Sequence, residues 1–537
     1  MVPMPVHKTL LRILLAAGIL LSVLQFWLPA YYLTCDGPCH LYNARIVHDV
    51  LSGSGGTSLF GRFYEVRISA IPNNFTTFTL ALLLTVFNGA IAAKLLYTLY
   101  VLVFISGFLV LLRRLGVRDS YWLLVVFLFP VSYAFAKGFS NFSFGLAFWF
   151  WMVAAWLRYL DEKRLLHLVP FIIVTAITYF THLLPFVLGV GTCAALILSY
   201  SCSPVAAPHR VRYLFIRMGI LLAGTLPFIV LAVLFTSGEG GLGLSVSPHP
   251  YRLIELLQFK YLKGFTDSEE MWALVAGVLL TAAGLVVIVR LLKRYAIHRY
   301  DGFFLVLLAS FFAYTFFPEE FMGRILIISI RMQWFIMIIV ACIAAFRLQG
   351  VRYREFAGGI LFLCFIIISI SRMSAMQEAS AALEPHMQAG NYIRAGSTVL
   401  ALDFSPGGRR ADGSAIMPLN PVFHHASQYL GSDKPLIFMD NYEANTGYFP
   451  VAWKYGVNPY VFLGRGGSHE AQMPAADIEG YEQHTGIAVD YVLMWGYTAA
   501  LAENAAFRKL TAPIDSGWRL VYTSAGDNTR LYARIGL

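Results

Sequence analysis

Apolar runs that approach the thickness of a membrane recur along the first 371 residues of the chain. A helix needs about 20 mostly apolar residues to cross the hydrocarbon core of a bilayer. Only 13% of the residues are charged, whereas soluble proteins carry about 25%. The sequence therefore predicts a polytopic α-helical membrane protein with about 11 transmembrane helices, at residues 10–31, 91–112, 120–136, 142–158, 166–181, 183–200, 213–236, 271–292, 302–317, 324–346 and 356–371.

The basic residues predict how these helices are oriented. Loops on the cytoplasmic side of a membrane protein are enriched in Lys and Arg. With a cytoplasmic N-terminus, 18 of the 40 basic residues fall in cytoplasmic loops, and the chain leaves its last helix on the outer side. The net charge of +10 is then a consequence of topology, and no nucleic-acid partner is expected. Residues 75–90 lack a basic flank, so we expect them to form a helix that lies at the outer surface or dips part-way into the membrane.

Two regions follow from this layout. Residues 1–371 form the transmembrane region, which includes a first outer loop at 32–90. Beyond residue 371 the chain is rich in Gly, Pro and acidic residues, with short alternating apolar runs that are typical of strands. We therefore expect a C-terminal α/β extracytoplasmic domain at 372–537. Its expected strands are 397–404, 434–441, 490–497 and a hairpin at 518–535, with helices at 376–395 and 498–510.

Polar residues are regularly spaced at the start of the first outer loop, in the stretch "DGPCHLYNARIV". Pro38 suits the first turn of a helix. In a helix beginning there, Asp36, His40 and Asn43 lie roughly in line on one side. The stretch then presents a carboxylate, an imidazole and an amide to one region of space. The alternative is an N-capping aspartate with unrelated polar neighbours.

The order of these features resembles that of the class C membrane glycosyltransferases, the GT-C enzymes that use polyprenyl-phosphate sugars. A first helix, an acidic residue opening a long outer loop, a many-helix body and an outer C-terminal domain are common to both. "DGPCHLYNARIV" resembles a D-x-x-x-H-x-x-R-type signature of uncharacterised bacterial members. "KGFSNFSFGLAFWF", "YFTHLLPF" and "FFPEEFMGRILIISIRMQWF" lie where that class has its later polar loops.

The resemblance implies an inverting hexosyl- or pentosyltransferase in the bacterial cytoplasmic membrane, with a periplasmic C-terminal domain. It implies a polyprenyl-phosphate-linked sugar as donor and a lipid or glycan as acceptor, both reached from the bilayer. Asp36 is the expected general base, because an acceptor hydroxyl must lose its proton as it attacks the anomeric carbon. His40, Asn43 and Arg45 are expected to contact or orient substrate.

The leaving lipid phosphate needs cations and hydrogen-bond donors near the membrane surface. Arg331 is a candidate, because a charge inside a span is costly unless it is paired or functional; a snorkelling arginine is the alternative. His182, between two spans, is either a phosphate ligand or an interfacial turn residue. Arg324 lies nearer the interface, and for this residue a functional role and a snorkelling arginine are equally open. Lys137 and Asn141 are more commonly structural at such positions.

No cofactor is assigned, and a divalent metal is left open. Metal-binding members of the class supply a second acidic site on a later outer loop, but residues 137–141 contain no carboxylate. Glu320 is the reserve candidate, although glutamates at a helix end are usually solvated. The expectation is therefore a site without a metal.

Cys35 and Cys39 flank Asp36 on the expected outer, oxidising side. Three arrangements are open for them. They could form a disulfide if the backbone brings their Cβ atoms within about 4.5 Å, or join His40 as three zinc ligands, or remain two buried thiols. The last is the commonest outcome for such a pair.

Two other classes of protein compete with a glycosyltransferase. A flippase for lipid-linked sugars would show two related halves and broken helices near the mid-membrane. Here the polar residues cluster at the outer interface. The chain has one long outer loop and one outer domain, and it does not show two related halves. A structural subunit of a cell-envelope assembly would give Asp36 and Arg331 no role. In the C-terminal domain, "PVFHHASQYL" and "MDNYEANTGYFP" suit carbohydrate stacking or a cap over the acceptor.

Overall fold

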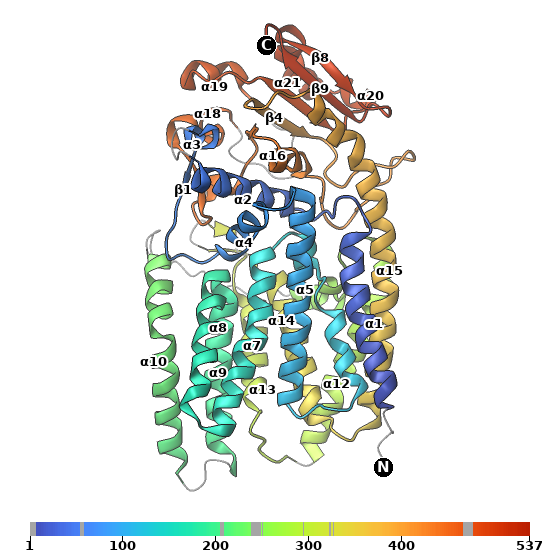
Figure 1. Ribbon diagram of the computed structural model, residues 1–537. Helices are drawn as coiled ribbons and strands as arrows, with labels where there is room; N and C mark the ends of the chain where they lie inside the picture. Colours follow the sequence, from blue (N-terminus) through green and yellow to red (C-terminus); the bar gives the residue numbers. More distant parts are fainter. Residues whose placement is uncertain are drawn as a thin grey trace.

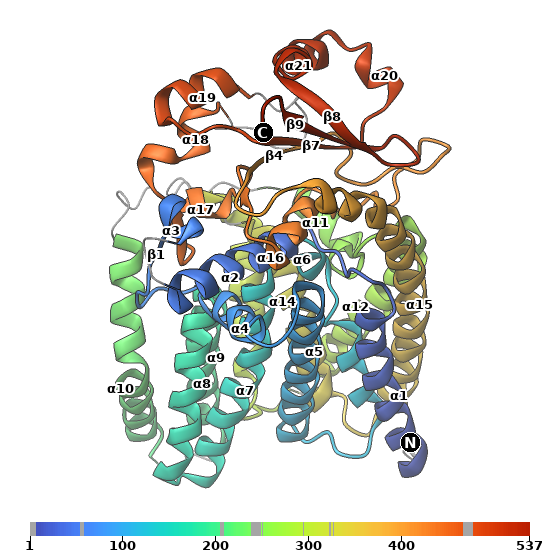
Figure 2. The same cartoon turned by 45° about the horizontal axis from the view of Figure 1, so that its top comes forward.

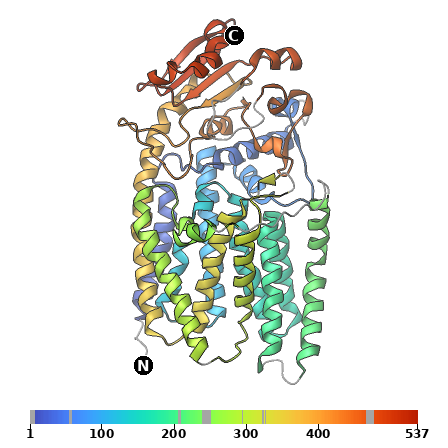
Figure 3. The ribbon, with the colours of Figure 1, turned by 180° about the vertical axis from the view of Figure 1, so that it is seen from behind.

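The structure, a computed structural model, shows a bundle of long helices below a smaller cap that contains the C-terminus (Figure 1). The N-terminus lies at the opposite end of the bundle, as the view from behind also shows (Figure 3). The structure describes residues 7–53, 58–204, 209–237, 249, 251–293, 295–321, 324–325, 327–464 and 476–537, without the side chains of 320, 321, 324 and 325.

Within the described residues, eight helices are long and apolar enough to cross a membrane. Three further segments expected to span are shorter, and these are α8 (Leu168–Thr181), α13 (Gly302–Phe316) and the stretch 121–136. The eight long helices are α1 (Lys8–Trp27), α5 (Gly89–Arg114), α7 (Ser140–Glu162), α9 (Leu183–Cys202), α10 (Arg210–Ser237), α12 (Glu270–Lys293), α14 (Ile328–Arg347) and α15 (Arg352–Gln388).

The expected helix at 120–136 is wrong in its geometry. The segment is a 3₁₀ helix, η2 (Tyr121–Leu128), followed by a bend and the four-residue α6 (Tyr133–Ala136). Pro130 interrupts the run because it lacks a backbone N–H, and the Ser132 hydroxyl starts α6 by accepting the N–H of Phe135 at 3.2 Å. The bend brings residues 136–138 to the end of the bundle that carries the cap.

The boundary expected at residue 371 lies within a helix. α15 continues through it as one helix of 37 residues that ends at Gln388, so most of the helical stretch expected at 376–395 is the last part of α15. Residues 360–384 contain neither Gly nor Pro to end the helix. Arg372 helps to hold this helix in place, because it is buried and its Nε donates to buried Glu269 at 2.8 Å. α15 thereby carries the chain from the bundle into the cap (Figure 1).

Polar contacts join the helix ends on the side of the N-terminus. Arg299 pairs with Asp161 at 3.0 Å, Arg347 pairs with Asp301, and the Tyr300 hydroxyl donates to the carbonyl of Arg114 at 2.9 Å. These residues belong to different loops that the alternation of basic segments assigns to one side. The structure therefore gathers them at one end of the bundle.

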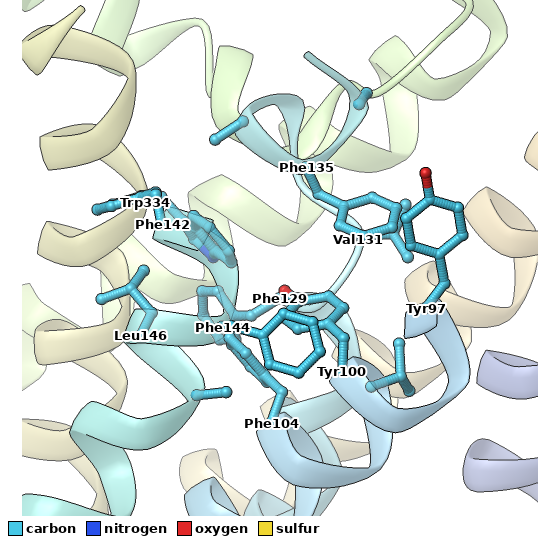
Figure 4. Packing of buried hydrophobic residues seen from close by; sticks show 14 of the residues in the cluster. Tyr97, Tyr100, Phe104, Phe129, Val131, Phe135, Phe142, Phe144, Leu146 and Trp334 are labelled. Carbon is cyan, nitrogen blue, oxygen red and sulfur yellow. The ribbon is translucent and has the colours of Figure 1, made fainter. Parts of the chain in front are cut away.

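An aromatic core fills the bundle just below the cap (Figure 4). Tyr100 on α5 stacks on Phe135 on α6 with ring centroids 5.2 Å apart. Phe104 on α5 stacks on Trp334 on α14 at 5.8 Å. Aromatic contacts of this kind add about 0.5–1.5 kcal/mol each beyond the burial of their area. They fix α5, α6 and α14 relative to one another beneath the first outer loop.

The cap contains a five-stranded sheet with the order β5-β4-β7-β9-β8. β4 is parallel to β5 and β7, while β9 is antiparallel to β7 and β8. The strands lie where the alternating apolar runs predicted them, and the last two form a hairpin that turns at Asp527 with φ of 50°. The strands are β4 (Thr398–Asp403), β5 (Ile437–Phe438), β7 (Tyr491–Trp495), β8 (Trp518–Thr523) and β9 (Thr529–Arg534), with helices α19 (Ile478–Thr485), α20 (Ala499–Ala502) and α21 (Ala505–Gly517) (Figure 2).

The first outer loop and the cap form one continuous structure. β1 (Tyr64–Val66) pairs antiparallel with β6 (Val451–Trp453). Tyr42 on α2 (Gly37–Ser52) donates its hydroxyl to the carbonyl of Leu436 at 2.8 Å. The expected surface helix is the nine-residue α4 (Phe75–Leu83), which packs on α2 and is too short to cross a bilayer. The remaining short elements are α3 (Leu59–Phe63), η3 (Leu165–His167), α11 (Tyr251–Leu257), η5 (Lys260–Leu262), η6 (Asp267–Glu269), β2 (Glu320–Phe321), β3 (Arg324–Ile325), η7 (Ala389–Tyr392), η8 (Ala426–Gln428), α16 (Tyr429–Asp433), α17 (Glu443–Thr446), η9 (Tyr455–Val457) and α18 (Pro459–Phe462).

Candidate active site

Asp36 stands at the start of α2 without capping it. Its side chain makes no capping hydrogen bond, and no described residue donates a hydrogen bond to its carboxylate. The reason lies in its neighbours. The N–H of Gly37 donates to the Thr34 hydroxyl at 3.1 Å, and Pro38 has no N–H to offer. The alternative of an N-capping aspartate is therefore wrong, and the partly exposed carboxylate remains available.

The backbone around Asp36 is held by the segment that follows α6. The N–H groups of Cys35 and Asp36 donate to the carbonyls of Ala136 and Lys137 at 3.0 and 3.3 Å. Gly138 has φ of +88°, and a Cβ there would lie 2.5 Å from the Asp36 nitrogen. Only glycine meets both conditions without strain. The "KGFSN" stretch therefore supports Asp36 through its backbone.

His40, one turn after Asp36, is buried against Glu443 of the cap. Its Nδ1 lies 2.8 Å from Glu443 Oε1 and its Nε2 lies 2.9 Å from the carbonyl oxygen of Gly138. Both neighbours are acceptors, so the doubly protonated imidazolium fits this setting. Burial opposes that charge, but the Glu443 carboxylate and the nearby Asp36 outweigh it and raise the pKa of His40 to about 9.

Asn43 completes the contact between α2 and the cap. Its Nδ2 donates to Glu443 Oε2 at 2.7 Å, and its Oδ1 accepts from Asn441 Nδ2 at 2.7 Å. Glu443 is fully buried, and a buried charge is tolerated only when it is paired and hydrogen-bonded. The three polar residues that the sequence places in line thus divide into two groups. His40 and Asn43 bind the cap, and Asp36 does not.

The cysteines form no disulfide, and both are buried. Cys39 Sγ donates to Asn441 Oδ1 at 3.4 Å, and burial raises the pKa of its thiol. A zinc site with His40 is excluded by the ring contacts of that histidine. Of the three arrangements left open by the sequence, the structure shows two buried thiols.

The ion pair of His40 and Glu443 gives a pH prediction. The pKa of His40 in the folded protein, about 9, exceeds its unfolded value of about 6.5. Its contribution to stability is therefore complete below pH 6.5 and is lost as the pH rises through 9. We expect the melting temperature of the parent to fall over this window relative to a His40→Gln/Glu443→Gln variant, which keeps the shape but removes both charges. Parallel melting curves of the two proteins from pH 6 to 10 would contradict the assignment.

Arg331, in the first turn of α14, carries a charge that has no close ion-pair partner among the described residues. No described carboxylate pairs with it, and its buried Nε has no hydrogen-bond partner there. Its guanidinium lies 4.6 Å from the ring centroid of Phe139 and 5.3 Å from that of Phe142. Asp36 and Glu319 are within its electrostatic range. The structure thus brings Arg331 to the segment that supports Asp36.

His182 also lies near the Phe142 ring. Its ring centroid is 5.4 Å from that of Phe142, and it is within electrostatic range of Arg331. Its Nδ1 accepts the N–H of Leu184 at 3.1 Å, so it also caps α9. His182 and Arg331, both candidates for the phosphate site, are therefore neighbours of the same ring, Phe142.

Two lysines add to the positive charge at this end. Lys137 and Lys260 lie 5.9 and 5.2 Å from the ring centroid of Tyr133. Lys137 directly precedes Gly138, which contacts Asp36. Lys260 is in η5, and nothing in its sequence context distinguishes it from an ordinary surface lysine. Sequence reasoning therefore missed it.

Two residues expected to bind substrate, Arg45 and Arg324, are not seen in this cluster, and neither are Asn141, which was expected to be structural, and the reserve metal ligand Glu320. Arg45 follows Asp36 by about two and a half helical turns, which places it on the opposite side of α2, and it pairs with Asp49 at 3.2 Å. Asn141 is buried and joins α4 to α7 by accepting the N–H of Thr76 at 3.0 Å. Arg324 and Glu320 lie in β3 and β2, and their side chains are outside the described part of the structure.

Two histidines and an aromatic ring of the cap are within electrostatic range of Asp36. His424 Nδ1 lies 3.2 Å from Asp403 Oδ2. Burial lowers the pKa of His424, but Asp403, with smaller contributions from Asp440 and Asp36, raises it overall. His425 stacks on Tyr442 at 4.9 Å, and the charge of Asp36 acts on both of these residues. The cap therefore closes over the first outer loop at Asp36.

The described carboxylates do not fit a divalent metal. Such an ion needs several oxygen ligands, and no group of three or more His, Cys, Asp or Glu side chains in the described residues could hold one. Glu443 is committed to His40 and Asn43, and Glu319 pairs with Arg252 at 2.9 Å. We therefore derive no step through a metal.

Comparison with known proteins gives a fold but no family. No protein-family model and no curated protein matches the chain. The chain is similar to the cryo-EM structure of the arabinofuranosyltransferase AftD from Mycobacteria, with a TM-score of 0.53 and 12% identity over 99% of this chain. A mutant of that enzyme aligns with a TM-score of 0.47, again at 12% identity over 99% of this chain, and 42% of the mutant is covered.

The match covers the whole of this chain but spans only 40% of the length of the AftD chain. At this identity the likeness concerns the fold. The chain therefore has a GT-C-like fold of membrane-spanning helices, as the order of its sequence features led us to expect.

Proposed function

We propose that the protein is a membrane glycosyltransferase. It transfers a sugar from a polyprenyl-phosphate donor to a lipid or glycan acceptor on the outer face of the bacterial cytoplasmic membrane. The N-terminus is then cytoplasmic, and residues 372–537 are periplasmic. The AftD enzyme, whose fold is similar, is an arabinofuranosyltransferase by name, so a pentose is one candidate for the sugar.

One observation carries this proposal. Asp36 keeps a partly exposed carboxylate that accepts no hydrogen bond from a described residue, although the polar residues in line with it are all paired. His40 and Asn43 bind Glu443, and Gly138 contacts the Asp36 backbone. This arrangement orients a carboxylate without using its oxygens. A general base requires such oxygens.

The transfer follows from this placement. Asp36 accepts the proton of the acceptor hydroxyl while the hydroxyl oxygen forms a bond to the anomeric carbon. The bond from that carbon to the phosphate oxygen breaks, and its electron pair leaves with the polyprenyl phosphate. Attack and departure occur on opposite faces, so the anomeric configuration inverts.

The leaving phosphate gains negative charge in this step. Positive charge is available from Arg331, which is within electrostatic range of Asp36, and from Lys137, whose carbonyl accepts the Asp36 N–H. His182 and Arg331 both lie near the Phe142 ring. A guanidinium can donate two parallel hydrogen bonds to a phosphate. The unpartnered Nε of Arg331 supports this role, because a buried donor without a protein partner suits a ligand.

The lipid chain of the donor has an apolar cavity available at the same end of the bundle. A cavity of about 360 Å³ opens between α4 and α8, and its lining is almost entirely apolar. α4 packs on α2, which begins at Asp36. The lining residues are Asn74, Phe75, Phe78, Ala176, Ile177 and Phe180.

The acceptor is placed on the cap side of Asp36. His424, His425 and Tyr442 offer hydrogen bonds and flat ring faces, which suit sugars. In this proposal, Glu443 and Asn441 are positioning residues that fix α2 against the cap and do not touch substrate.

Binding of the donor tests the proposal directly. We expect one member of a panel of polyprenyl-phosphate sugars to raise the melting temperature of the purified protein, because a ligand at 100 times its Kd adds about 2.7 kcal/mol to stability. The same compound should support sugar transfer to membrane-extracted lipids or glycans. The proposal fails if no member stabilises the protein more than the bare polyprenyl phosphate and none is consumed.

A further inference from the structure

A second, basic cavity lies at the end of the bundle that carries the N-terminus. It measures about 650 Å³ and is bounded by α1, the last turns of α5 and the segment leading into η2. Its walls combine positive charge with an apolar surface. The basic lining residues are Lys8, Arg12, Arg113, Arg114 and Arg118, one residue is acidic, Asp119, and the apolar residues are Leu11, Leu15, Val110 and Leu123.

The positive charge of this cavity is only partly balanced. Lys8 pairs with Asp119 at 2.9 Å, and Arg114 lies 3.7 Å from Glu162. The side chains of Arg12, Arg113 and Arg118 form no ion pair or hydrogen bond with any residue that the structure describes. Four other arginines at this end of the bundle have carboxylate partners, namely Arg158, Arg299, Arg347 and Arg354.

The surroundings of the cavity distinguish a lipid from a soluble anion. Leu11 and Leu15 line it from α1, and Leu10 and Ile13 of the same helix are 42% and 58% exposed. A soluble phosphate gains nothing from the apolar part of the lining, Leu11, Leu15, Val110 and Leu123, whereas the acyl chains of a phospholipid cover it. Basic pockets between helices on the cytoplasmic side of a membrane suit acidic headgroups.

We propose that this cavity binds the phosphate headgroup of an anionic membrane phospholipid, with the acyl chains lying along α1 and α5. Arg12, Arg113 and Arg118 are its phosphate ligands. The site is separate from the proposed transfer site, which lies at the cap end of the bundle. The inference therefore does not depend on the proposed function.

The test measures lipid binding to the purified full chain in a neutral detergent. Phosphatidylglycerol is titrated while binding is followed by the melting temperature and by native mass spectrometry. Phosphatidylcholine and inorganic pyrophosphate serve as the comparison ligands. The variant Arg12→Gln/Arg113→Gln/Arg118→Gln is compared with Arg290→Gln/Lys293→Gln, which removes exposed charges from the last turn of α12, outside this cavity.

We expect phosphatidylglycerol to stabilise the parent, and the triple variant to bind it roughly 100-fold more weakly, because each basic residue contributes about 1 kcal/mol to attraction by anionic lipid. The α12 control should bind like the parent. If the triple variant does not fold, Arg118→Gln alone should still weaken binding about fivefold.

Three results would overturn the inference. Equal binding of phosphatidylcholine would remove the role of charge. Pyrophosphate binding as tightly as the lipid would make the ligand a soluble phosphate compound. Unchanged phosphatidylglycerol binding by the charge variants would place the lipid elsewhere.

Discussion

An Asp36→Asn protein is expected to lose sugar transfer almost completely and to melt like the parent. The amide keeps the shape of the side chain but cannot accept the proton of the acceptor hydroxyl. General bases contribute about 100- to 10,000-fold to rate, so kcat should fall within that range. Stability should change little, because the Asp36 side chain makes no capping hydrogen bond and Glu443 contributes more than Asp36 to holding the charge of His40.

A matched control is available on the same helix. Asp49 is also in α2, but it is partly exposed and pairs with Arg45. Asp49→Asn should retain transfer within a few-fold, since exposed ion pairs contribute only about 0–1 kcal/mol. Initial rates with saturating donor, together with melting curves, separate the two variants. An Asp36→Asn enzyme that transfers at a near-parental rate would remove the proposed mechanism.

The first outer loop shows how far local sequence could predict this site. The spacing of Asp36, His40 and Asn43 predicted one helix with all three on one side, and the helix is present. The partner of that side could not be predicted, because Glu443 is 400 residues away from Asn43 in the chain. A glutamate in a polar stretch is usually solvated, and only the folded cap makes it a fully buried charge.

The capping alternative failed for a reason that the sequence contained. Pro38 has no N–H at the second helical position, where an N-cap side chain often finds a donor, and Thr34 takes the N–H of Gly37. The proline was therefore a sign that the Asp36 side chain does not cap the helix. The role of Thr34 depends on the backbone bend at residues 34–36, which spacing alone does not give.

In the membrane segments, too, the sequence predicted one property and not another. Hydropathy located the apolar runs correctly. A segment within the bilayer must be apolar whether its backbone forms an α-helix or another structure. Hydropathy could not distinguish an α-helix from the 3₁₀ helix and bend at 121–136, because both bury the same side chains. The bend matters for the site, since it delivers the carbonyls of Ala136 and Lys137 to the Asp36 backbone.

An Arg331→Gln protein is expected to lose about 100- to 1,000-fold in kcat, as other enzymes do when one donor to a developing anion is removed. The negative charge on the phosphate grows as the bond to the sugar breaks, so the guanidinium stabilises the transition state more than the bound donor. The loss should therefore appear mainly in kcat, with a smaller rise in KM.

Stability separates this role from a structural one. Arg331 has no carboxylate partner among the described residues and an unpartnered Nε, so its replacement breaks no protein ion pair there. Arg331→Lys keeps the charge without the planar fork and should recover part of the lost rate. Steady-state kinetics of both variants with a single polyprenyl-phosphate sugar, beside their melting temperatures, make the comparison. If Arg331→Gln lowers the melting temperature and Arg331→Lys recovers none of the rate, Arg331 holds α14 in place and does not bind the donor phosphate.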